Sequence, residues 1–240
     1  MKTSNKILAG MVIALLLIPT CIMIALAIKI KNDDFEIRIT EWERSARANK
    51  KINNTGVMKL TAPVGSALVC TIHYSDSVYY RKYSRGDSLS VETQGDTLSF
   101  TVIKRGGKEN EGANEHDDNP LHVDVFMPFR GLLMLDGAEV KIDSLAPDTE
   151  LQVEMVNNSR FITAEKRPTR FSSLFVNALD SRIHVAGNTS IDNLKLNLRG
   201  KSVAELQIGA EIGSVSGSLE QTAHVSGPAK WLYQLKPVGD

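Results

Sequence analysis

The pattern of apolar and polar positions divides the chain into three parts. Residues 7–28 form an apolar run without charges, residues 32–55 are charged and mixed in sign, and from Gly56 short alternating segments are separated by Gly, Ser and Asp. Alternation with a period of two is typical of strands that bury one face. The pattern therefore predicts an apolar helix, then a stalk or short helix, then a β-rich region over residues 56–240.

The N-terminal apolar run is long enough to cross a membrane. It holds about 22 residues between Lys6 and Lys29, and at about 1.5 Å per residue it spans a hydrocarbon core of roughly 30 Å. Pro19 is compatible with this, because neighbouring groups in a transmembrane helix can satisfy the freed carbonyl. We expect residues 1–31 to form a cytoplasmic tail and a transmembrane anchor, so that a membrane is one partner of the chain.

A cleaved signal peptide is the alternative for the same segment. Lys2 and Lys6 give it a basic start, and Ala25–Ala27 resembles a cleavage site of small residues. The apolar run exceeds the usual signal-peptide core of roughly 7–15 residues, which favours an uncleaved, single-pass anchor. Both alternatives export the large C-terminal region, so we expect it to be periplasmic or otherwise extracytoplasmic, at an inner membrane or at the cell surface.

Five short strands are expected between residues 57 and 104. They are rich in Val, Thr, Tyr and Phe and recur about every ten residues, and Gly95–Asp96 forms a tight turn between two of them. This spacing favours a β-hairpin section. Residues 105–120 lack large apolar side chains, so we expect a mobile loop there.

Alternation also predicts which side chains in this section are buried. Leu98, Phe100 and Val102 share one face of their strand. Cys70 alternates with Leu68 and Ile72 in the same way, which predicts a core thiol rather than a reactive one. Since Cys70 is the only cysteine of the exported region, no disulfide within it is possible.

Beyond Phe129 the apolar strands recur at a nearly constant interval, and a small or polar turn divides each unit. The strands begin 18 to 23 residues apart, near Leu133, Leu151, Leu174, Leu194 and Ile212. A unit of this length cannot bury its own apolar face, but stacked units share one column of inward side chains. We therefore expect an all-β fold, a parallel β-helix or β-solenoid, preceded by the hairpin section.

Charge and motifs exclude several functions. The formal net charge is zero and the pI is about 7.0, whereas nucleic-acid binding requires a basic surface. The sequence has no phosphate-binding loop, no nucleophile elbow and no Cys-x-x-Cys pair, so we expect no cofactor. His116–Asp118 lies in the loop without a second cluster of ligands, and we expect no metal site.

An enzyme that cleaves polysaccharides is the main alternative to a binding protein. Glycosidic chemistry uses paired carboxylates, and the candidates are Asp124, Asp136, Asp143 and Asp180, with Arg182 and His184 beside the last. Of these, Asp136 and Asp180, with His184, are the residues that such an enzyme would use. Aspartate is also favoured at turns because it bonds its own backbone, and this accounts for both carboxylates without catalysis. We expect no catalytic site. Convergence of these side chains on one groove would favour the enzyme.

Two clusters of residues are candidates for ligand contact. Tyr79, Tyr80 and Arg81 form an aromatic and basic group suited to an anionic or glycan partner, although a basic edge strand explains it equally. Trp231 and Tyr233 near the C-terminus are candidates for sugar stacking, with capping of the last coil as the alternative.

The segment LHVDVFMPFRGLLMLDGAEVKIDSL and the closing HVSGPAKW resemble auto-transporter adhesin head domains with a GIN motif. Such domains occur mainly in Bacteroidota as exported or membrane-anchored proteins. The resemblance covers about Gly56 to Lys236 and implies a right-handed β-helix of unknown biochemical activity. The family name implies adhesion, so we expect a binding, adhesion or scaffold module whose partner is an envelope protein or a glycan. An accessory protein of envelope signalling is a further alternative.

Overall fold

The computed structural model describes residues 50–52, 55–83, 88–103, 120–164 and 166–237, together with Leu15, which is helical. The chain divides into two compact units, Met1–Arg44 and Ser45–Asp240. Apart from Leu15 and Pro120, the expected membrane anchor and the expected mobile loop lie outside the described residues, as does most of the expected stalk. Among the residues that are described, no helix combines the length and the apolar character needed to cross a membrane.

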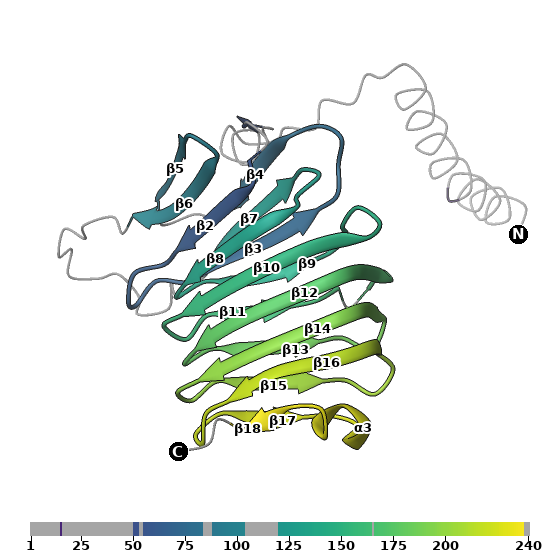
Figure 1. Ribbon diagram of the computed structural model, residues 1–240. Helices are drawn as coiled ribbons and strands as arrows, with labels where there is room; N and C mark the ends of the chain where they lie inside the picture. The colour runs from purple at the N-terminus through teal and green to yellow at the C-terminus, as the bar shows by residue number, and fades with distance from the viewer. Residues whose placement is uncertain are drawn as a thin grey trace, which may run out of the picture. The chain divides into compact units, whose positions relative to one another are not determined.

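The described part of Ser45–Asp240 is built from two nine-stranded sheets, A and B, which are visible in Figure 1. Sheet A contains, in spatial order, β1 (Lys50–Lys51), β4 (Tyr79–Tyr83), β7 (Leu121–Phe126), β3 (Leu68–His73), β9 (Glu139–Ile142), β11 (Arg160–Ile162), β13 (Arg182–Val185), β15 (Val203–Leu206) and β17 (His224–Ser226). Sheet B contains, in spatial order, β18 (Lys236–Pro237), β16 (Glu211–Leu219), β14 (Thr189–Arg199), β12 (Thr169–Leu179), β10 (Thr149–Val156), β8 (Gly131–Asp136), β2 (Val57–Thr61), β6 (Thr97–Ile103) and β5 (Ser88–Gln94).

From β8 to β17 the chain alternates between the sheets, and each strand pairs in parallel with the equivalent strand of the next unit. This confirms the expectation of a mostly β fold with parallel strands. Leu151 pairs with Leu174 and Leu174 with Leu194, and all three are buried. These leucines therefore form the expected inward column.

The first aliphatic residues of the two outer units lie beside this column rather than in it. Leu133 pairs with Val153, and Ile212 pairs with Ile191, so each lies in a different column. Gly131 and Val215 occupy the column of the leucines instead. Both strands carry several apolar residues at alternating positions, and a repeat defined by its first aliphatic residue cannot choose among them.

The expected separate hairpin section was wrong for β2 and β3. β2 pairs in parallel with β6 and β8, and β3 pairs in parallel with β7 and β9, so both strands belong to the parallel sheets. Among the strands that the structure describes, only β5 and β6 form the expected hairpin, which closes at Gly95–Asp96. Period-two alternation reports burial of one face and is the same for parallel and antiparallel neighbours.

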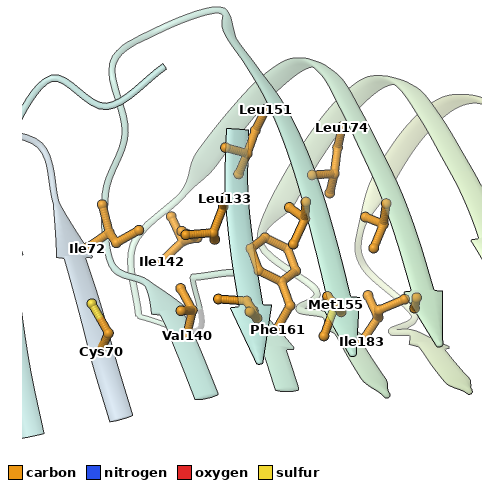
Figure 2. Close-up of a cluster of buried hydrophobic side chains, with 14 of the residues drawn as sticks. Cys70, Ile72, Leu133, Val140, Ile142, Leu151, Met155, Phe161, Leu174 and Ile183 are labelled. Atoms are coloured by element: carbon orange, nitrogen blue, oxygen red, sulfur yellow. The ribbon is translucent and has the colours of Figure 1, made fainter. Parts of the chain in front are cut away.

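The core lies between the sheets, where both contribute inward side chains (Figure 2). The predicted inward residues Leu98, Phe100 and Val102 are buried, as is Cys70 with Leu68 and Ile72. Burial, and to a smaller degree the charge of Asp124, raises the pKa of the Cys70 thiol. The thiol therefore remains protonated and packs as a small apolar group.

The turns after β8, β10, β12 and β14 lie at one edge of the two sheets, at the left of Figure 1. Their outward positions adopt left-handed backbone conformations, with φ of 68° at Gly137, 57° at Asn157, 50° at Asp180 and 59° at Gly200. Asparagine and aspartate tolerate this conformation better than other side chains. Turns of different composition can therefore share one shape.

A column of buried serines closes three of these turns from inside. The hydroxyl groups of Ser159, Ser181 and Ser202 each donate to the carbonyl oxygen that ends the preceding strand, at 2.6 Å, 2.8 Å and 2.6 Å. All three residues are at most 1% exposed. A buried strand end requires such a partner for its last carbonyl.

The C-terminal segment covers the last strands with a short helix, α3 (Ala229–Leu232). Trp231 is 2% exposed and belongs to the main core, whereas Tyr233 is 89% exposed. Trp231 therefore packs as the expected cap would, and its ring offers almost no surface to a ligand. Tyr233 keeps its ring in solvent.

Candidate functional site

Two of the three residues in the N-terminal aromatic and basic group meet on the outer face of sheet A. The ring of Phe126 on β7 lies between those of His73 on β3 and Tyr79 on β4, with centroid distances of 4.6 Å and 4.5 Å. The guanidinium of Arg81 lies 5.0 Å from the Phe126 centroid and 5.5 Å from that of Tyr79. We call His73, Tyr79, Arg81 and Phe126 the aromatic–basic cluster.

Tyr80 lies apart from this cluster, on the opposite face of β4. It is 8% exposed and packs edge-to-face on Phe100 in the core, with 5.5 Å between the centroids. Burial raises the pKa of its hydroxyl. Consecutive residues of a strand point to opposite faces, so adjacent tyrosines cannot share one site.

Carboxylates extend the aromatic–basic cluster into a charged network. His73 Nδ1 lies 3.0 Å from Asp143 Oδ2, and His73 Nε2 lies 3.8 Å from Asp124 Oδ1. Arg167 Nη1 in turn lies 3.6 Å from Asp143. The nearby carboxylate of Asp124 raises the pKa of His73, burial of the imidazole lowers it, and Asp143 raises it further. His73 and Phe126 were not predicted as site residues, because their only sequence feature is an outward position in a strand.

We predict that His73 makes stability depend on pH. Because its pKa is raised from 6.5 in the folded state, its contribution is complete below that value and is lost as the pH rises through the folded-state pKa. The unfolding free energy of the unsubstituted protein, measured with urea, is therefore expected to fall between pH 6 and pH 8.5. In His73→Gln this fall is expected to be smaller. His224→Gln at an exposed histidine is the control, and an equal effect of both variants would contradict the prediction.

A groove of about 1030 Å³ runs along the edge formed by the turns. We call it the turn-edge groove; it is lined by Thr61–Ser66, Asp136, Gly137, Asn157, Asn158, Asp180, Arg182, Lys201 and Val203. The lining comes from the turns of successive strand pairs and from the segment that follows β2. A ligand in this groove would therefore lie across the strands rather than along them.

The groove brings together the two carboxylates predicted for an enzyme. Asp136 and Asp180 both line it, roughly 10 Å apart by the spacing of two strands. Asp136 Oδ1 accepts a hydrogen bond from Asn157 Nδ2 at 2.7 Å, and Asp180 Oδ1 accepts one from the backbone N–H of Lys201 at 2.8 Å. Each carboxylate thus ties its own turn to the next one.

The third predicted residue of the enzyme lies elsewhere. His184 on β13 does not line the turn-edge groove, and its Nδ1 lies 3.1 Å from Glu205 Oε2 on β15. Asp124 and Asp143 belong to the network around His73. The predicted group of side chains is therefore divided between at least two surfaces.

Two cations line the turn-edge groove together with the carboxylates. Arg182 and Lys201 are exposed, and within the described residues neither side chain forms an ion pair. The charged side chains of the lining are two acidic and two basic groups, so their formal charges cancel. In the described part of the chain, no group of His, Cys, Asp or Glu is arranged to hold a metal ion.

The outer face of sheet B carries ladders of polar side chains. Asn197 Nδ2 donates to Asn177 Oδ1 at 2.9 Å, and the hydroxyl of Ser218 donates to Asn197 Oδ1 at 3.1 Å. Beside this ladder the ammonium group of Lys195 lies 4.9 Å from the centroid of Phe175. These contacts link equivalent positions of neighbouring strands.

The comparisons with known proteins leave the resemblance to adhesin head domains a prediction: the sequence matches no protein-family model, and no curated protein matches it.

Proposed function

We propose that the chain is a non-catalytic binding or adhesion module that an N-terminal anchor holds outside the cytoplasm. In this proposal the stacked strand pairs form a β-solenoid, and the turn-edge groove receives an extended envelope partner. The observation that carries the proposal is the groove itself, because it crosses several turns and leaves both of its cations without an ion pair among the described residues.

The register of the strands supports binding of an extended partner. The pairings of β8, β10, β12 and β14 set equivalent turn residues one strand spacing apart, about 4.8 Å. The interior below the turns is close-packed, so the spacing is held rigidly. A rigid row of side chains suits a partner with a regular repeat, because little ordering is needed on binding.

The hydrogen bonds of the groove support a role without catalysis. Asp136 and Asp180 each hold a turn in place, which is a sufficient structural role. A polysaccharide-active enzyme that uses both carboxylates is the competing proposal, and His184 would have to act from another surface. The variants Asp136→Asn and Asp180→Asn are therefore expected to retain binding to the envelope partner, because asparagine keeps an acceptor oxygen at each position.

Two measurements on the full chain test the proposed function. Protease treatment of intact cells and spheroplasts is expected to digest the C-terminal domain once the cell envelope is opened. The detergent-solubilised chain is expected to sediment with isolated cell-envelope fragments. Protection of the domain in spheroplasts would contradict export, and failure to sediment with any envelope fraction would contradict the binding function.

A further inference from the structure

We infer that the turn-edge groove binds an extended, uncharged oligosaccharide whose residues follow the row of turns. This inference rests on the proposed function and names the ligand of the same site. It is argued from the charge, the hydrogen-bonding groups, the shape and the spacing of the groove.

Charge favours a neutral ligand. Asp136 and Asp180 balance Arg182 and Lys201 within the lining, so the groove has no excess charge of either sign. A polyanion such as a nucleic acid gains its affinity from an excess of basic groups that neutralise phosphates. A strongly acidic or basic chain would place like charges against two of these four side chains.

The hydrogen-bonding groups favour a polyhydroxylated ligand. Arg182 and Lys201 present donors only, the carboxylates present acceptors only, and the Asn158 side chain presents both. A hydroxyl group both donates and accepts. A chain with several hydroxyl groups per unit can therefore satisfy both the donors and the acceptors of this groove.

Exposed apolar side chains at one end of the groove favour a sugar ring as the ligand. The segment after β2 forms an apolar wall in which Val64 is 98% exposed and Pro63 is also exposed. A pyranose ring has an apolar face of C–H groups between hydroxylated edges. The wall offers contact for that face, while the polar turns lie on the remainder of the groove.

Spacing distinguishes a sugar chain from an extended peptide. Adjacent turns are about 4.8 Å apart, which is close to the rise of one hexose in an extended chain. An extended peptide advances about 3.3 Å per residue, so its equivalent groups fall out of step with the turns. The four turns after β8, β10, β12 and β14 therefore correspond to about four sugar residues.

Calorimetric titration of the full chain in detergent tests the inference. The probes are glucose and N-acetylglucosamine oligomers of two to six residues, with polygalacturonate as an anionic probe. Affinity for at least one neutral series is expected to rise with length up to about four residues and then level off, as four turns dictate. Arg182→Ala and Lys201→Ala are each expected to weaken binding about tenfold, since each removes a charged donor.

Lys195→Ala is the matched control, because it removes one exposed lysine from the outer face of sheet B and is expected to leave the affinity unchanged. Equal losses in the control and groove variants would overturn the assignment of the site. Tighter binding of polygalacturonate than of every neutral oligomer would overturn the ligand class. If no oligomer binds while the chain still sediments with envelope fragments, the inference fails and the proposed function stands.

Discussion

Replacement of Phe161 by alanine is expected to cost about 3–5 kcal/mol of unfolding free energy. Phe161 on β11 is fully buried, and Figure 2 shows its ring in the interior among side chains from both sheets. Neighbouring backbones are fixed by parallel pairing with β9 and β13, so the cavity cannot collapse fully. Urea unfolding followed by far-ultraviolet circular dichroism measures the loss.

Phe175→Ala is the matched control for this prediction. This variant removes the same kind of side chain from the outer face of β12, where the ring is only half-buried. The expected loss of unfolding free energy is about 1 kcal/mol. A loss for Phe161→Ala no larger than that of the control would show that the interior between the sheets is not the main source of stability.

Gly217→Ala is expected to destabilise the C-terminal strands by about 3 kcal/mol. Gly217 on β16 has a φ of 139°, and an added Cβ would overlap the backbone carbonyl of Leu196 on β14. The overlap would push β14 and β16 apart where Leu196 pairs with Gly217. Because α3 packs on β16, the burial of Trp231 should fail together with this pairing.

Tryptophan fluorescence measures this local effect. In a Trp42→Phe background, Trp231 is the remaining tryptophan of the sequence, and its emission is expected to shift to the red at a lower urea concentration in Gly217→Ala. Gly95→Ala is the control, because Gly95 also has a positive φ of 59° but open space around it, so only about 1 kcal/mol of backbone strain is expected. The prediction is wrong if both variants shift the Trp231 transition equally.

The repeating part of the fold could be predicted because each unit carries its own evidence. Leu151, Leu174 and Leu194 fall at similar places in units of similar length, and the sheets stack them. The sequence around β2 and β3 lacks this regular interval, because β4, β5 and β6 lie between β3 and its parallel neighbour in sheet A, β7. The neighbours of β2 and β3 are fixed by tertiary packing, which local alternation does not encode.

The candidate site was predictable only where neighbours in sequence are neighbours in space. Tyr79 and Arg81 point to the same side of one strand and lie together in the structure, whereas Tyr80 was grouped with them although its ring faces the core. The groove joins residues more than 130 positions apart, such as Pro63 and Lys201. No spacing rule in the sequence connects such residues, because their meeting depends on how many units lie between them.

The serine column separates two tasks within each turn. Since Ser159, Ser181 and Ser202 satisfy the strand ends from inside, the outward side chains of Arg182 and Lys201 are not needed to keep the loops closed. These two exterior positions can change with little effect on folding, whereas the left-handed backbone at Asn158, with a φ of 60°, favours asparagine, aspartate or glycine. Natural or laboratory selection could therefore change the ligand specificity of this surface one turn at a time, while the core beneath it stays the same.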